Sequence, residues 1–111
     1  MHMGSAAIVG AAGVANFKHV ILNNGVHDSV GGMASAGLRV SFREIVMACG
    51  YTEAWRVERR EEVAEKVARL RSARGPAMLE IMVQKGARTD LGRPTTSPTE
   101  NKTAFQKFLA R

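Results

Sequence analysis

The stretch FKHVILNNGVHDSVGG, residues 17–32, decides the fold expected of this chain. Its apolar run over residues 20–22 stops abruptly at Asn23, Asn24 and Gly25, and polar, turn-forming residues follow. A short apolar run between turn signals is typical of a buried strand in a parallel sheet rather than of an edge strand. Ligands of open α/β sheets lie beyond the carboxyl ends of the strands, so we expect a cofactor beside Asn23, Asn24 and the turn that follows.

Apolar runs and amphipathic segments alternate around this strand. Residues 58–73 form the clearest amphipathic helix, because Val63, Val67 and Leu70 recur at helical spacing. Strands that alternate with helices favour a parallel, right-handed α/β unit. The pattern predicts helices over residues 4–14, 41–50, 58–73 and 99–111, and strands over residues 18–22, 54–57 and 77–83.

Two other segments are polar and show no periodicity. Residues 23–37 contain four glycines, which indicates backbone freedom or a close approach to a ligand. Residues 85–102 form a long polar connection that contains two prolines. Irregular loops of such length are usually functional or disordered, so we expect residues 23–37 to carry function.

Composition limits the architecture and the compartment. A chain of 111 residues forms one domain at most, and an apolar fraction of 45% supports a core. The single cysteine, Cys49, excludes an internal disulfide and fits a reducing, cytoplasmic compartment, and we expect it to be buried. No apolar run is long enough to cross a bilayer, and the start lacks the basic region of a signal peptide, so no membrane role is expected.

The formal net charge of +6 raises the possibility of a nucleic-acid partner. The basic residues are spread along the chain, however, and many lie in the mixed-charge helix over residues 58–73. No RNA-binding or zinc motif accompanies them. We therefore expect no nucleic-acid partner.

Two longer strings carry a family resemblance. NNGVHDSVGG, with DLGRPTTSPTENK at residues 90–102, resembles the thiamine-diphosphate-dependent decarboxylases and, among them, the phosphonopyruvate decarboxylase family. The resemblance spans residues 1–109. It implies a partial thiamine-diphosphate-binding domain, a three-layer α/β/α structure with a small parallel sheet. The family signature begins with GDG, which this chain lacks, so residues 1–111 are expected to be the C-terminal diphosphate-binding fragment of a longer enzyme.

The resemblance also implies a cofactor site for thiamine diphosphate and Mg²⁺. It assigns two metal ligands, the side-chain oxygen of Asn24 and the backbone carbonyl of Val26; the aspartate of the missing GDG would be the third. The cofactor-binding residues that it implies are Asn23, Asn24, Gly25, Val26 and Ser29. Asn and Gly are also the usual turn residues, so from the residues alone a plain turn remains open.

Further roles follow by resemblance for residues in the two polar segments. His27 and Asp28 are the expected catalytic residues, with His27 binding a substrate anion or moving a proton. An exposed histidine satisfied by water is the alternative. Arg88 and Arg93 are expected near the substrate, because guanidinium groups suit phosphonate oxygens, with solvated loop charge as the alternative.

The function implied by the resemblance is decarboxylation of 3-phosphonopyruvate to phosphonoacetaldehyde and CO₂. The expected partners are a missing pyrimidine-binding domain or subunit, a small 2-oxo acid substrate and further copies of the chain in a homo-oligomer, and the chain alone is expected to be inactive. Two alternatives remain: the β subunit of a split sulfopyruvate-type decarboxylase, and a non-catalytic, basic α/β interaction module.

Overall fold

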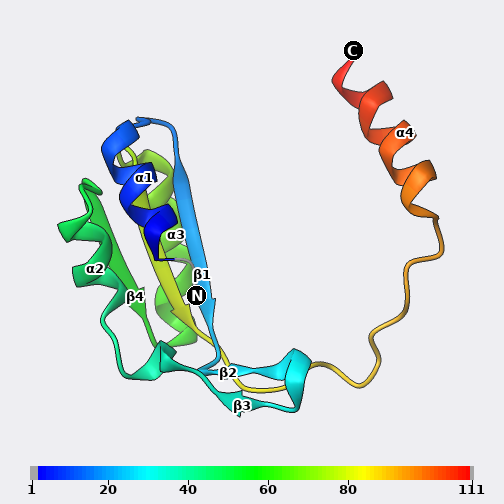
Figure 1. Cartoon of the computed structure of the whole chain (residues 1–111), viewed down its shortest axis with the longest axis horizontal. Coiled ribbons are helices and arrows are strands. Elements are labelled where there is room, and N and C mark those ends of the chain that lie inside the picture. Colours follow the sequence, from blue (N-terminus) through cyan, green and yellow to red (C-terminus); the bar gives the residue numbers. More distant parts are fainter. Residues whose placement is uncertain (1–2, 111) are drawn as a thin grey trace.

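Three parallel strands form the centre of the structure. In the computed structural model, which describes residues 3–110, these strands are β1 (Lys18–Asn23), β4 (Glu53–Val57) and β5 (Ala77–Met82). Their order across the sheet is β1-β5-β4, and β5 pairs in parallel with both neighbours (Figure 1). The three strands expected from the sequence are thereby confirmed.

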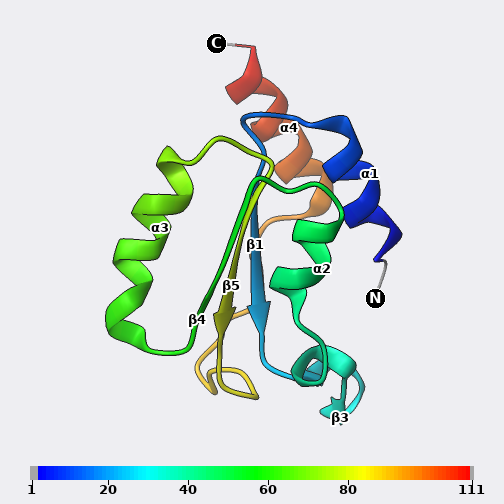
Figure 2. The ribbon, with the colours of Figure 1, turned by 90° about the vertical axis from the view of Figure 1, so that its left-hand side faces the viewer.

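Helices cover the two faces of this sheet. Helices α1 (Gly4–Ala12) and α2 (Phe42–Ala48) lie on one face, and α3 (Val63–Ser72) lies on the other (Figure 2). Apolar side chains form a separate cluster on each face, around Val46 and Met78 beneath α2 and around Leu70 and Leu79 beneath α3. The expected three-layer α/β/α arrangement is confirmed.

The path of the chain explains why the helices divide between the faces. From β1 the chain crosses through α2 to β4 at the far side of the sheet, and it returns through α3 to β5 in the middle. The direction across the sheet reverses between these crossovers. Two crossovers of the same hand then require helices on opposite faces, as the structure shows.

One expectation about β1 is wrong. Its composition predicted a strand buried on both faces, yet β1 is an edge strand and β5 is the central one. Val20 is 48% exposed and Leu22 is 66% exposed. Both side chains project away from the face that α1 covers, and α3 packs mainly over β5 and β4, so nothing within residues 3–110 buries them.

Helix termini follow the polar residues that the sequence places there. The Ser41 hydroxyl accepts a hydrogen bond from the Glu44 backbone N–H at the start of α2. The helix expected over residues 58–73 begins later, as a 3₁₀ turn, η3 (Arg60–Glu62), that leads into α3. Within residues 3–110, no helix combines the length and the apolar character that a membrane crossing needs.

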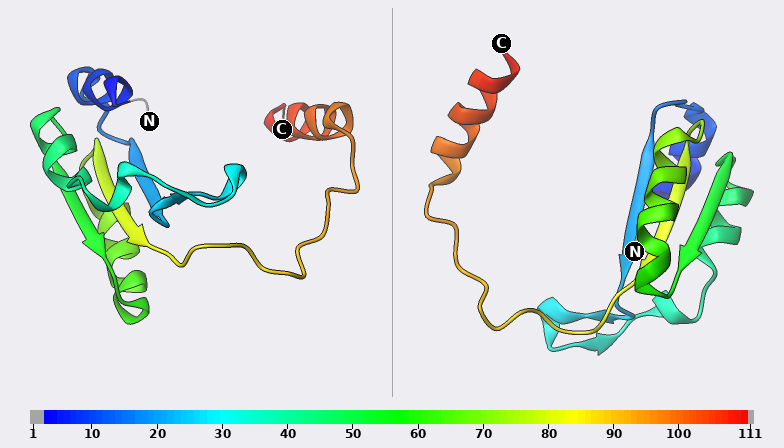
Figure 3. Two further views of the ribbon diagram at one scale, coloured as in Figure 1. Left: turned by 60° about the horizontal axis from the view of Figure 1, so that its bottom comes forward. Right: turned by 180° about the vertical axis from the view of Figure 1, so that it is seen from behind.

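The last helix lies apart from the sheet. Residues 83–97 lead away from β5 to α4 (Pro98–Leu109), which stands clear of the other elements (Figures 1 and 3). Ser97 and Glu100 form a reciprocal capping box that stabilises its first turn. Phe105 and Phe108 are exposed, so the apolar face expected on this helix covers nothing within the described part of the chain.

Close packing of α1 on α2 depends on Gly10. A Cβ atom at this position would lie 1.8 Å from the Cys49 carbonyl oxygen, so only glycine fits. Cys49 follows α2 at this contact and is half-buried rather than fully buried as expected.

Candidate functional site

The polar stretch after β1 folds into a small hairpin. Strand β2 (Val26–His27) pairs antiparallel with β3 (Met33–Ala34), and a 3₁₀ turn, η1 (Asp28–Val30), joins them. Another 3₁₀ turn, η2 (Ala36–Leu38), leads on towards α2. The segment expected as an irregular loop is therefore ordered by backbone pairing at the carboxyl end of the sheet (Figure 1).

Asn23, the last residue of β1, turns its side chain inward. Its Nδ2 donates to Glu80 Oε1 at 2.7 Å and to the Gly37 carbonyl at 2.8 Å. Its Oδ1 accepts from the Gly25 backbone N–H at 2.9 Å. Asn23 thus connects the sheet, the turn after β1 and the η2 segment through internal hydrogen bonds.

Glu80 is a buried acid that the sequence-based assignments did not include. It is 1% exposed at the centre of β5, beside β1. The one signal for it is an acidic residue inside the apolar strand AMLEIMV, residues 77–83. Since buried polar groups need partners, the pair of Glu80 with Asn23 fixes the position of the turn that follows β1.

Asn24, the neighbouring residue, turns away from the core. Its Oδ1 accepts from the Val26 backbone N–H at 3.1 Å, and its Nδ2 donates to Asp28 Oδ2 at 2.7 Å. The first bond makes an Asx turn, which supports the plain-turn interpretation of Asn24. The amide oxygen retains a second lone pair, so the same geometry leaves it able to bind a cation.

Asp28 links the loops that follow two adjacent strands. Its Oδ2 accepts from Asn24 Nδ2 and, at 3.2 Å, from the Gly86 backbone N–H. These loops meet because β1 and β5 are neighbours and end at the same level, with Asn23 opposite Met82. The sheet topology therefore brings residues 24–28 and residues 85–86 together at one edge.

The other residues assigned by resemblance lie around this edge. Val26 begins β2, and the side chains of His27 and Ser29 are exposed on the hairpin. His27 ends β2, next to Asp28, but the structure gives no hydrogen bond between their side chains. Their catalytic and cofactor roles remain predictions.

Arg88 and Arg93 lie further along the segment that leaves β5. Arg88 makes two hydrogen bonds to Asp90, from Nε at 2.9 Å and from Nη2 at 3.0 Å. The Arg88 guanidinium holds the pKa of Asp90 below its usual value. Because Arg88 is bonded to Asp90 within its own loop and Arg93 is exposed, the structure places neither against the hairpin.

The side-chain oxygen atoms at this edge suit a hard cation that is also bound by anionic ligands from outside the chain. Asn24 offers an amide oxygen and Asp28 a carboxylate, both oxygen ligands of the kind that Mg²⁺ prefers. Among residues 3–110, no group of three or more His, Cys, Asp or Glu side chains could hold a metal ion. The residues present therefore fit Mg²⁺ held largely by a diphosphate, with Asn24 orienting it.

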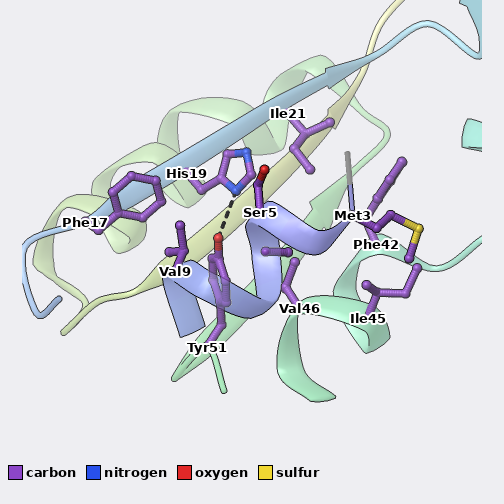
Figure 4. Close-up of a pocket in the computed structure, with 11 residues that line it drawn as sticks. Met3, Ser5, Val9, Phe17, His19, Ile21, Phe42, Ile45, Val46 and Tyr51 are labelled. Carbon is purple, nitrogen blue, oxygen red and sulfur yellow. Dashed lines mark hydrogen bonds between the residues drawn. The ribbon is translucent and has the colours of Figure 1, made fainter. Parts of the chain in front are cut away.

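A separate cavity of about 430 Å³ lies between α1, α2 and the sheet (Figure 4). It is lined mainly by apolar residues, and its polar feature is a 3.2 Å contact between His19 Nδ1 and the Tyr51 hydroxyl. Burial lowers the pKa of His19 and raises the pKa of Tyr51. None of the residues assigned to a ligand lines this cavity, which belongs to the space between the helices and the sheet.

The shifted pKa of His19 predicts a pH effect on stability. The unfolded chain binds the imidazole proton more readily than the folded chain, so acidification from pH 7.5 to 5.5 should lower the free energy of unfolding. The substitution His19→Gln should flatten this dependence, whereas His27→Gln, at an exposed position, should keep it. Urea unfolding at several pH values measures the effect, and equal pH dependence in wild type and His19→Gln would contradict it.

Comparison of the sequence with known proteins shows the family of this chain. The sequence model of the family described as thiamine pyrophosphate enzyme, C-terminal TPP binding domain, matches residues 1–81. The chain is 32% identical over 109 residues to a phosphonopyruvate decarboxylase from Streptomyces viridochromogenes, and 32% identical over 108 residues to one from Streptomyces hygroscopicus.

These alignments cover 98% and 97% of this chain but only 28% and 27% of the two relatives, so the chain spans little more than a quarter of their length. The family match contains the whole of β1, the hairpin, α3 and most of β5. The chain therefore belongs to the thiamine pyrophosphate enzymes, as a C-terminal TPP-binding domain.

Proposed function

We propose that this chain is the C-terminal part of a Mg²⁺-dependent decarboxylase that converts 3-phosphonopyruvate to phosphonoacetaldehyde and CO₂. The single observation that supports this most strongly is the orientation of Asn24. Its side chain lies outside the core at the carboxyl end of β1, within the segment that matches the family, while Asn23 holds the turn from inside. The choice of substrate rests on the names of the two relatives.

In this proposal the chain's residues bind and orient rather than form bonds to substrate. Asn24 Oδ1 and the Val26 carbonyl hold Mg²⁺, and Gly25 lets the backbone approach the diphosphate with a φ of +73°. Ser29 lies beside the cofactor. When bound, thiamine diphosphate supplies a sink for the electron pair that remains as CO₂ leaves.

His27 and Asp28 are proposed to handle protons and the substrate anion. His27 lies exposed on the hairpin, where its imidazole can move the proton that replaces the carboxylate. Asp28 accepts from Asn24, so it also sets the rotamer of the proposed metal ligand.

The remaining partners follow from the length of the relatives. We propose that a pyrimidine-binding domain or subunit completes the site, that the assembly is a cytoplasmic homo-oligomer and that a 2-oxo acid is its small-molecule substrate. The open edge of β1, with Val20 and Leu22 exposed, supports a missing neighbour on that side.

The proposal predicts opposite results for the isolated chain and for a chimera. With Mg²⁺, thiamine diphosphate and 3-phosphonopyruvate, the 111-residue chain alone should show no turnover. A chimera should retain activity within about tenfold of the parent, a barrier change of ~1.4 kcal/mol, when this chain replaces the aligned C-terminal segment of the Streptomyces viridochromogenes enzyme.

Release of phosphonoacetaldehyde measures both reactions. Sulfopyruvate offered in place of 3-phosphonopyruvate is the control for substrate class. Turnover by the isolated chain would contradict the fragment assignment. A folded chimera that is inactive, or that prefers sulfopyruvate, would contradict the proposed substrate.

A further inference from the structure

The end of the Lys85 side chain lies against the hairpin at Gly32. A Cβ atom on Gly32 would lie 2.7 Å from Lys85 Cε and 2.8 Å from Lys85 Nζ. Gly32 also has a φ of +74°, which favours glycine independently. The absent side chain of Gly32 thus makes room for the ammonium group of Lys85 on top of the hairpin.

The order of the strands in the sheet places the Lys85 ammonium group beside the hairpin. Lys85 follows β5 by three residues, and the next residue, Gly86, donates its backbone N–H to Asp28 Oδ2. This bond fastens the loop after β5 to the loop after β1. The position of Lys85 beside Gly32 is therefore a consequence of strand order, and no spacing pattern in the sequence predicts it.

Lys85 also differs from Arg88, the next basic residue of its segment. Arg88 is paired with Asp90, whereas Lys85 Nζ has no ion-pair partner among the carboxylates of residues 3–110. An ammonium group without a carboxylate partner, held at the edge where a cofactor and substrate are proposed, suits an anionic ligand. Its side chain lies against Gly32 of the hairpin, whereas Arg88 is bonded to Asp90.

We propose that Lys85 binds the phosphonate dianion of the substrate, an inference that rests on the proposed function. The phosphonate is favoured over the cofactor's diphosphate by the position of Asp28. Asp28 Oδ2 faces Asn24, the proposed metal ligand, while Asp28 Oδ1 faces the space above Gly32, 3.9 Å from the site of its missing Cβ. An anion at Lys85 is thus separated from a diphosphate at Asn24 by the Asp28 carboxylate.

The direct test is a titration of the ¹⁵N-labelled 111-residue chain in phosphate-free, Mg²⁺-free buffer. The probe is methylphosphonate, and the readouts are the backbone amide shifts of Gly32, Lys85 and Gly86. Lys85→Met should weaken binding about tenfold, because a charge-assisted hydrogen bond is lost, and Lys85→Arg should restore most of it. Lys107→Met, on the exposed surface of α4, is the matched control and should change nothing.

A second variant tests the geometry without removing the charge. Gly32→Ala keeps the ammonium group but places a methyl group where the lysine side chain lies, so it should also weaken methylphosphonate binding. A titration without any Lys85-dependent shift would overturn the proposal. Inorganic pyrophosphate that displaces methylphosphonate from the same amides would overturn the phosphonate assignment in favour of the diphosphate.

The chimera separates this inference from the proposed function. There, Lys85→Met should raise KM for 3-phosphonopyruvate about tenfold with little change in kcat or in the thiamine diphosphate concentration for half-activation. An inactive chimera would contradict the proposed function while leaving the titration as the test of Lys85. An active chimera whose KM is insensitive to Lys85→Met would overturn the role of Lys85 alone.

Discussion

Replacing Asn23 by alanine is expected to lower the free energy of unfolding by about 3 kcal/mol, because it removes a buried side chain that three partners share. The Asn23 amide joins Glu80, the Gly37 carbonyl and the Gly25 N–H. With alanine, all three groups lose a hydrogen bond at a site closed to water. Glu80, which is 1% exposed, is the most costly of them to leave without a partner.

Urea unfolding monitored by circular dichroism measures this effect. Glu80→Gln is the matched control, since it keeps an oxygen that accepts from Asn23 Nδ2, and it should change the free energy of unfolding by less than about 1 kcal/mol. A loss below ~1 kcal/mol in Asn23→Ala would mean that Asn23 does not hold the turn.

Replacing Asn24 by alanine should affect turnover rather than the free energy of unfolding. Its hydrogen bond to Asp28 is exposed and the one from the Val26 N–H is only partly buried, so the free energy of unfolding should change by less than about 1 kcal/mol. In the chimera, however, turnover at fixed Mg²⁺ and thiamine diphosphate should fall by about 100-fold or more, because the proposed metal ligand is lost. Neighbouring asparagines at the end of β1 would thus separate stability from function.

The matched control for Asn24→Ala is Asn16→Ala, an exposed asparagine in the turn before β1. It should leave both turnover and stability close to wild type. A chimera in which Asn24→Ala keeps more than about a tenth of the parental turnover, a barrier change under ~1.4 kcal/mol, would contradict the metal-ligand role.

The sequence predicted the elements of this fold better than their arrangement. Periodicity and turn residues located β1, β4 and β5 to within one residue at each end, because apolar composition and local backbone preference decide those elements. Ser41 with Glu44 three positions later marked the start of α2, whereas the similar pair Ser97 and Glu100, which caps α4, was not used. Each of these signals lies within one short stretch of chain.

Features that depend on contacts between distant residues were missed or wrong. The run over residues 20–22 suggested a buried strand, but strand order placed β1 at the edge, and strand order depends on the whole sheet. Glu80 meets Asn23, and Lys85 meets Gly32, across 57 and 53 positions of sequence. No local pattern encodes such pairs, so only the fold reveals that a buried acid holds the turn.

The turn after β1 is proposed to hold, through Asn24, a divalent cation bound to a diphosphate. Paramagnetic broadening of amide resonances tests it most directly, with Mn²⁺ in place of Mg²⁺ and thiamine diphosphate added to the ¹⁵N-labelled chain. The account predicts broadening centred on Asn24, Gly25 and Val26 that disappears in Asn24→Ala. Broadening centred elsewhere, or unchanged in Asn24→Ala, would contradict it.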